Sequence, residues 1–226
     1  MSAQLSRILV GLCGIFGTIV LGLYFGVGFS AGLAQLPASA TMTQVVSVAI
    51  QHHTLWFFGT WLQATGSLLS VIFFLALVQR AGQTASLAGL LTIVGSAVLL
   101  AVVLIEGVFT LDLAQAAANG HQITSLTSFE IMTVFTYIYP IVPAPVIFLA
   151  LGTILLGSHV LPRVFGYVAC GLGIAFEVVG LLALFTTPIL TIIVLSLQAL
   201  WVLAAALTWL FGAGAVSGAR GQAHSG

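Results

Sequence analysis

Six long apolar runs, separated by shorter polar stretches, dominate the pattern of hydrophobic and polar positions along the chain. The runs do not alternate in polarity as barrel strands do, and each is near the roughly 20 residues that a helix needs to cross a bilayer core of about 30 Å. Backbone polar groups in lipid must bond within their own segment, so we expect an all-α bundle of six transmembrane helices. Their expected ranges are Ile8–Phe29, Leu55–Val78, Leu87–Phe109, Ile131–Leu155, Val164–Phe185 and Ile189–Phe211.

The polar stretches predict the connections between the spans. Pro37 to Thr54 and Thr110 to Glu130 read as polar loops, the second being the longest, and Thr186-Thr187-Pro188 reads as a tight turn. These loops are too short to fold alone, so residues 1–211 are expected to form one transmembrane domain. The Gly-, Ala- and Ser-rich tail, residues 212–226, is expected to be flexible.

Composition excludes several classes of protein. Hydrophobic residues make up 61% of the 226 residues and charged residues only 4%, whereas soluble domains carry about 25% charged residues. The four basic residues are too few for a nucleic-acid surface, so membrane lipid is the expected partner. Cys13 and Cys170 both lie inside apolar runs, which excludes a disulfide scaffold.

The first apolar run has to be distinguished from a secretory signal peptide. Ala38-Ser39-Ala40 resembles a cleavage site, but the run Ile8–Phe29 has 22 residues, well beyond the apolar region of about 7–15 residues in a signal peptide. We therefore expect a retained first span.

The arginines predict the orientation. With six spans, all four arginines fall on the same side of the membrane as both termini, which places that side in the cytoplasm and the protein in the plasma membrane. Trp56 near the outer face and Trp209 near the inner face suit interfacial belts. The arginines are Arg7, Arg80, Arg163 and Arg220.

Small residues at helical spacing predict close helix packing on two spans. Such faces let membrane helices approach closely, either within the bundle or between copies and partner helices. The face on the fifth span consists of Gly166, Cys170, Gly173, Glu177 and Gly180. The first span carries Gly11, Gly14 and Gly17, followed by Gly22 and Gly26.

The fourth span has prolines near its middle, at Pro140, Pro143 and Pro145. Each removes a backbone N–H and clashes with the preceding turn, so a kink or a break is expected there. The freed carbonyls require this stretch to face protein or a wet cavity.

Strongly polar residues concentrate in the outer half of the spans, which predicts a pocket open to the outside and closed on the cytoplasmic side. A through-pore needs polar lining at both ends, so a channel is disfavoured. Glu177 and Glu106 are the candidate catalytic acids. The candidate ligand-binding residues are Gln63, Tyr137, Tyr139, Gln198 and Trp201.

Glu177 is the most informative of these residues, because an acid placed centrally in the membrane costs roughly 2.5–3.5 kcal/mol on insertion scales. No basic residue lies at its depth, so we expect a protonated carboxyl paired with Gln198, Gln63 or a tyrosine. It either serves function or hydrogen-bonds helices together. Glu106, near the outer end of its span, is either functional or a solvated helix end.

Residues of metal-ligand type gather near the outer rim, but their spacing matches no metal signature. Hydrolase, P-loop and dinucleotide motifs are also missing from the sequence. No metal and no cofactor is therefore expected. The residues are His52, His53, Glu106, Asp112, His121 and Glu130.

The start of the fifth span, Leu161-Pro162-Arg163, resembles that of a family of uncharacterised six-span bacterial membrane proteins. In the last span, the stretch from Pro188 to Trp201 looks like the P…E…W pattern of their last helix. Gln198 stands there where an acid is often found. The resemblance covers about residues 50–210 and implies a six-helix membrane bundle with no particular activity.

Three functions remain open on the sequence. The first is a non-enzymatic membrane protein whose outward-facing pocket binds a lipid or an apolar small molecule. The second is a membrane enzyme acting on a lipid or isoprenoid, with Glu177 or Glu106 as general acid. The third is a subunit or assembly factor of a membrane complex. Acids that line one cavity would favour the enzyme.

Overall fold

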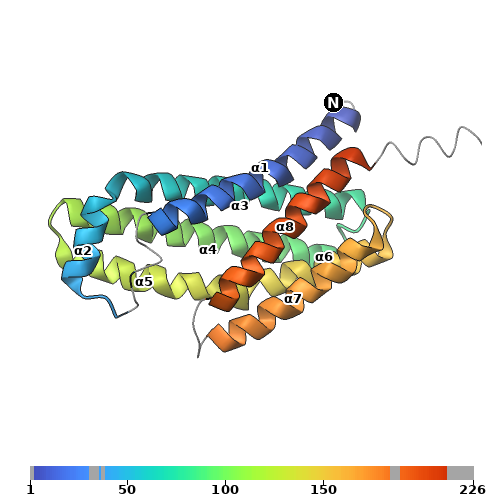
Figure 1. The fold of residues 1–226 in the computed structure, drawn as a ribbon. Coiled ribbons are helices and arrows are strands. Elements are labelled where there is room, and N and C mark those ends of the chain that lie inside the picture. Colours follow the sequence, from blue (N-terminus) through green and yellow to red (C-terminus); the bar gives the residue numbers. More distant parts are fainter. Residues whose placement is uncertain (1–2, 31–35, 37–38, 184–188, 213–226) are drawn as a thin grey trace, which may run out of the picture.

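The computed structural model describes residues 3–30, 36, 39–183 and 189–212. Every regular element in these residues is a helix (Figure 1). The helices are α1 (Ala3–Ser30), α2 (Met42–Gln51), α3 (His53–Arg80), α4 (Leu87–Ala118), α5 (Gln122–Ile141), α6 (Pro143–Gly157), α7 (Arg163–Ala183) and α8 (Ile189–Phe211). Five of them, α1, α3, α4, α7 and α8, are long and apolar enough to cross a membrane. The described chain is therefore a helical membrane bundle.

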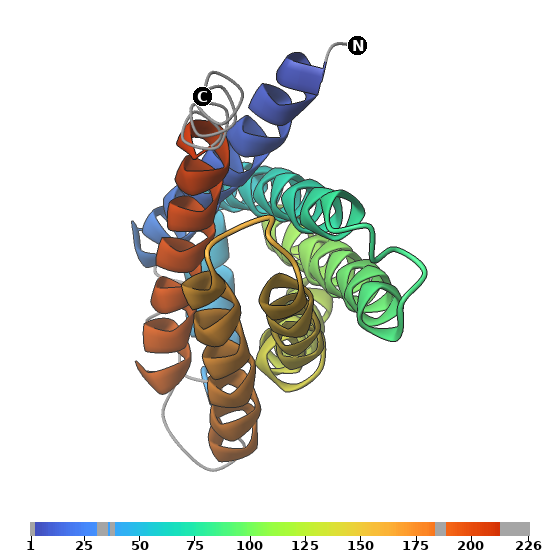
Figure 2. The same cartoon turned by 90° about the vertical axis from the view of Figure 1, so that its right-hand side faces the viewer.

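The five long helices and the shorter α6 close into a ring. Going round it, α1 packs on α3, α3 on α4, α4 on α6, α6 on α7, α7 on α8, and α8 returns to α1. Figure 2 looks along this ring from the end where α1 begins. Phe148 stands at the centre of the core, with ring centroids 5.8 Å from Phe74, 5.9 Å from Phe176 and 5.5 Å from Trp201. This aromatic cluster joins α3, α6, α7 and α8.

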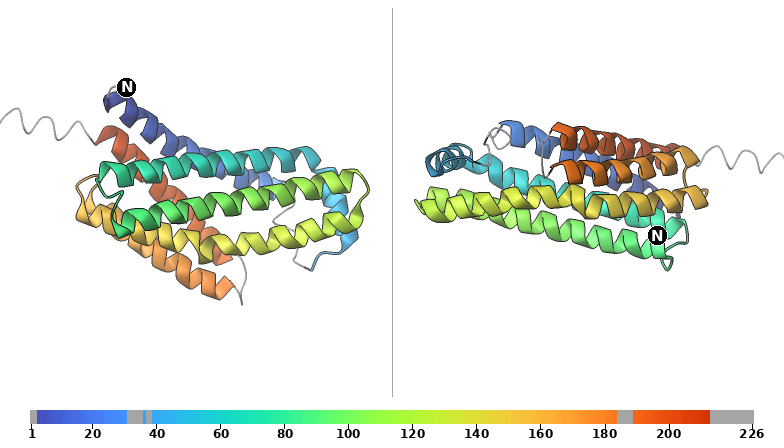
Figure 3. Two further views of the ribbon diagram at one scale, coloured as in Figure 1. Left: turned by 180° about the vertical axis from the view of Figure 1, so that it is seen from behind. Right: turned by 90° about the horizontal axis from the view of Figure 1, so that it is seen from below.

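The predicted fourth span, Ile131–Leu155, is divided between two helices in series. α5 ends at Ile141 and α6 begins at Pro143, with Val142 between them at φ −118° and ψ −68°. The expected proline break is confirmed, because Pro143 occupies the first turn of α6, where a missing N–H costs nothing. Seen from behind in Figure 3, α3, α4 and the α5–α6 pair lie side by side.

Two predicted loops are largely helical. Within the stretch from Pro37 to Thr54, Met42–Gln51 forms α2, which begins with a capping box between Thr41 and Gln44. In the second loop, from Thr110 to Glu130, α4 continues to Ala118 and α5 starts at Gln122. The loop predictions were wrong because polar side chains such as Ser47 and Gln115 lie on the exposed sides of helices that pack on one another. The predicted turn at 186–188 and the tail from 213 on lie outside the described residues.

These helices build a compact cap at one end of the bundle. At about 1.5 Å per residue α4 is about 48 Å long, well beyond a bilayer core of about 30 Å. α2 packs across the protruding ends of α4 and α5. The cap has its own hydrophobic core: Ala40, Val45, Ala49, Trp56, Leu113, Ala114, Ala117, Phe129 and Met132. Trp56 is only 1% exposed, so its expected place in an interfacial belt is wrong.

The opposite end gathers the arginine-bearing helix ends. α1 begins, α3 ends, α7 begins and α8 ends there (Figures 1 and 2). The first and last helices are clasped together: the Arg7 guanidinium donates to the Leu210 carbonyl at 3.0 Å, and the Trp209 indole donates to the Arg7 carbonyl at 3.0 Å. We call this the arginine end. Arg220 lies outside the described residues.

Candidate functional site

Glu106 is paired across two helices. Gln63 Nε2 on α3 donates to Glu106 Oε2 on α4 at 2.8 Å, and the glutamine is buried. Glu106 is therefore neither a freely solvated helix end nor an isolated acid, because it accepts a hydrogen bond from a buried glutamine of the neighbouring helix.

A second polar pair links α5 to α8. The Tyr139 hydroxyl donates to Gln198 Oε1 at 2.6 Å, while the Tyr139 ring meets the edge of Phe176 at 5.7 Å. The pair lies just before the break at Val142 and holds the end of α5 against α8. The side chain of Tyr137, the other candidate tyrosine, lies outside the described part of the chain.

Glu177 does not take the buried position expected of it. Its side chain is exposed on α7, although the glycines of the same face are packed against α6. Two of its expected partners are used elsewhere, since Gln63 bonds Glu106 and Gln198 bonds Tyr139.

The small-residue faces are used inside the bundle. A Cβ added at Gly173 would lie 2.9 Å from the Leu149 backbone nitrogen, so α6 and α7 touch backbone to backbone there. On α1, a Cβ at Gly17 would lie 3.0 Å from the Ser70 nitrogen of α3. Gly22 and Gly26 differ, because an added Cβ at either would meet open space. The expected packing role is confirmed for Gly11, Gly14 and Gly17 and not for Gly22 and Gly26.

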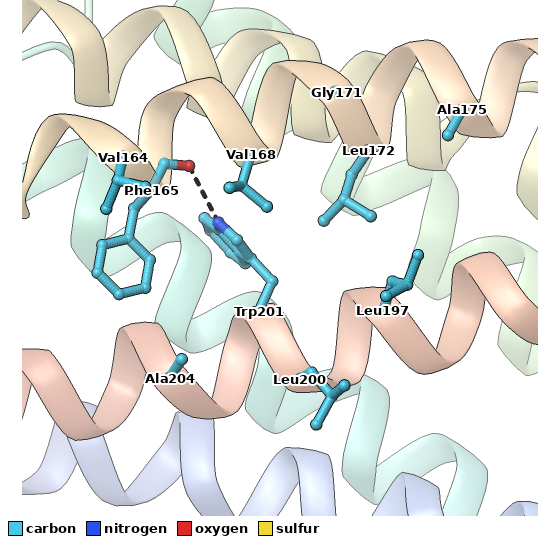
Figure 4. Close-up of a pocket in the computed structure, with 10 residues that line it drawn as sticks. All are labelled: Val164, Phe165, Val168, Gly171, Leu172, Ala175, Leu197, Leu200, Trp201 and Ala204. Carbon is cyan, nitrogen blue, oxygen red and sulfur yellow. Dashed lines mark hydrogen bonds between the residues drawn. The ribbon is translucent and has the colours of Figure 1, made fainter.

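An apolar groove of about 580 Å³ lies between α7 and α8 (Figure 4). Trp201 stands in its middle and is fixed there, because its indole Nε1 donates to the Phe165 carbonyl at 3.0 Å. Val164 is 59% exposed and Leu200 63%, so the walls of the groove reach the outer surface of the bundle. The lining residues are Val164, Phe165, Val168, Gly171, Leu172, Ala175, Leu197, Leu200, Trp201 and Ala204.

A second hollow, of about 590 Å³, follows the polar side of α2 at the cap. It is lined by Leu36, Thr43, Gln44, Ser47, Val48, Gln51 and His52. Among the candidate site residues, Trp201 lines the α7–α8 groove, and none lines the hollow on α2. The structure therefore separates these candidates into two hydrogen-bonded pairs, a groove residue and an exposed acid.

The His, Asp and Glu side chains near the cap, which are residue types that bind metals, do not come together in one site. Within the described residues no three His, Cys, Asp or Glu side chains come together in a way that would hold a metal ion. Asp112 is instead a structural acceptor, since the Ser128 hydroxyl donates to its carboxylate and ties α4 to α5. It does not converge with Glu106, because α4 runs unbroken through both positions.

Sequence reasoning missed the groove almost entirely. A groove between two helices depends on how they cross, and no motif marks it. One signal was available: Val164, Val168, Gly171 and Ala175 follow a four-three-four spacing that puts small residues on an otherwise bulky apolar stripe.

No protein-family model matches this chain, and no curated protein and no solved structure is significantly similar to it. The resemblance to six-span bacterial membrane proteins therefore stays a prediction.

Proposed function

We propose that this protein is a non-enzymatic integral membrane protein that binds a lipid acyl chain, or an apolar molecule of similar shape, in the α7–α8 groove. The observation that carries the proposal is the groove itself, whose lining offers almost only hydrocarbon and aromatic surface. Its single polar side-chain group, the Trp201 indole N–H, is already bonded to Phe165. A polar ligand would find no partner there, whereas a hydrocarbon chain needs none.

The rest of the bundle supports a membrane location for this groove. α7 and α8 are both long and apolar enough to span a bilayer, so a groove between them faces lipid at acyl-chain depth. The ligand is accordingly drawn from the membrane and not from water. This moves the proposed binding site from an outward-facing pocket to the side of the bundle.

We further propose six membrane crossings, with α5 and α6 together forming the fourth, and both termini in the cytoplasm of a plasma-membrane protein. The clasp between Arg7 and Leu210 supports an even number of crossings, because it holds the first and last helices together at the same end. Arg80 is the last residue of α3 and Arg163 is the first residue of α7, and both lie at that end. An excess of basic residues favours the cytoplasmic side.

The enzyme hypothesis receives less support from the arrangement of the acids. Glu106 is engaged by Gln63 between α3 and α4, whereas Glu177 is exposed on α7. α6 stands between α4 and α7 in the ring. A general acid needs to reach a bound substrate together with the groups that orient it, and neither carboxyl lines the groove.

The proposal is tested by filling the groove. Gly171 lines it, and an added Cβ there would meet open space, so Gly171→Phe fills the groove without straining the helix. Gly22→Phe is the matched control, because Gly22 also lies open on a lipid-facing helix but far from the groove. Purified protein is loaded with a phospholipid that carries a photoactivatable acyl chain.

Cross-links are expected on the α7 and α8 peptides of the unaltered protein and of Gly22→Phe, and are expected to fall at least severalfold in Gly171→Phe. Cross-links spread evenly over all helices, or equal labelling of the two variants, would contradict a site in the groove.

A further inference from the structure

We infer that the α7–α8 groove selects a phospholipid with an anionic headgroup, whose phosphate is bound by Arg163 at the mouth of the groove. This inference rests on the proposed function, because it assigns the headgroup of the lipid whose acyl chain occupies the groove. Arg163 is the first residue of α7, it is exposed, and Val164 and Phe165, which follow it, line the groove.

The length of the groove fits one acyl chain in one leaflet. On α7 the lining runs from Val164 to Ala175, a rise of about 16 Å at 1.5 Å per residue. One leaflet of a bilayer core of about 30 Å is about 15 Å deep. The groove therefore begins at the headgroup level of the arginine end and ends near the midplane, as an acyl chain does.

The charge at the mouth complements a phosphate. Arg163 carries a guanidinium, which matches phosphate geometry with paired N–H donors. The first turn of α7 adds the positive end of the helix dipole. The next acid along α7 is Glu177, about 21 Å further up the helix, so it does not neutralise the mouth.

The arrangement also favours the cytoplasmic leaflet as the source of the lipid. In the proposed orientation the arginine end faces the cytoplasm, where anionic lipids make the surface potential negative. A lipid that enters from this leaflet brings its headgroup directly to Arg163. A lipid from the opposite leaflet would hold its headgroup about 30 Å away, beyond Ala175, where the lining of the groove on α7 ends.

Competition between two lipids of identical acyl chains tests the headgroup. Full-length protein in detergent is titrated with phosphatidylglycerol and phosphatidylethanolamine, and bound lipid is counted by native mass spectrometry. We expect a preference for phosphatidylglycerol that falls about fivefold in Arg163→Gln, the contribution of a single basic residue at an anionic surface. Arg163→Lys is expected to keep most of the preference.

Arg80→Gln is the matched control, because Arg80 is another exposed arginine at the same end but on α3. An equal loss in Arg163→Gln and Arg80→Gln would overturn the inference in favour of diffuse surface charge. An unchanged preference in Arg163→Gln would overturn it outright. Gly171→Phe distinguishes binding of the acyl chain in the groove from selection of the headgroup by Arg163. It should abolish binding of both lipids, and if it does not, the groove is not the binding site.

Discussion

Gln63 donates a hydrogen bond of 2.8 Å to Glu106, so the amide of α3 and the carboxyl of α4 satisfy one another inside the membrane domain. An acid at this depth is costly unless it is paired or protonated, and here the partner comes from the neighbouring helix. Glu106 therefore links α4 to α3.

Removing the donor of this pair should cost more than changing its acceptor. Gln63→Leu leaves the Glu106 carboxyl without its partner and should lower the free energy of unfolding by roughly 1 kcal/mol. Glu106→Gln keeps an oxygen that accepts the bond and should cost less. Denaturant titration of tryptophan fluorescence in detergent measures both. A larger loss in Glu106→Gln would mean that the acid does more than accept this bond.

Two glycines of α7, two residues apart, should respond in opposite ways to alanine. At Gly173 a Cβ would lie 2.9 Å from the Leu149 nitrogen, whereas at Gly171 it would meet nothing within 4 Å. Gly173→Ala should destabilise the bundle by about 1–3 kcal/mol through overpacking. Gly171→Ala should be neutral or stabilising, by up to about 1 kcal/mol from helix propensity. Thermal unfolding compares them directly, and equal effects would rule out a tight α6–α7 crossing.

Glu177 should tolerate loss of its charge. It is exposed and none of the described hydrogen bonds of the bundle depends on it. Glu177→Gln should change the free energy of unfolding by no more than about 0.5 kcal/mol and leave lipid binding intact. Comparing the free energies of unfolding of Glu177→Gln and Glu106→Gln distinguishes an exposed acid from one that is hydrogen-bonded between helices. Loss of folding in Glu177→Gln would return this residue to the structural role that its glycine-rich face first suggested.

Accessibility of two engineered cysteines should report the orientation. Ser47 is exposed on α2 at the cap, and Gln83 is exposed in the turn after α3 at the arginine end. With Cys13 and Cys170 replaced by alanine, Ser47→Cys should react with a membrane-impermeant maleimide on intact cells. Gln83→Cys should react only after permeabilisation. The reverse pattern would place the arginine end outside, and labelling of both in intact cells would contradict the single crossing, by α3, that separates them.

Sequence periodicity located the long helices well because a membrane span needs an uninterrupted apolar run. The last span, Ile189–Phe211, coincides with α8, and the prolines near Pro143 mark the division between α5 and α6. The cap was missed because its helices are short or extend beyond the apolar runs. Its signals were nevertheless present: Thr41 and Gln44 form a capping box, and Gly120 adopts φ +78° at the turn after α4.

The candidate site was harder to predict, for a physical reason. Depth along a helix follows from counting residues, and it drew attention to Gln63 and Glu106, which the structure joins by a hydrogen bond. The direction in which a side chain points, and which helix stands opposite, depend on the order of helices around the ring. Glu177 shares a helical face with packed glycines, yet its own side chain is exposed. The α7–α8 groove arises from a crossing that no local pattern records.

The clasp of α1 by α8 has a consequence for how the protein is made. Gly11 and Gly14 on α1 face Leu210 and Ala206 on α8, so α1, which leaves the ribosome before α8, waits for it before its packing is complete. Until α8 is made, α1 exposes a small-residue face to lipid or to the insertion machinery. A chain truncated before α8 would keep that face open, which gives membrane quality control a direct mark of an unfinished molecule.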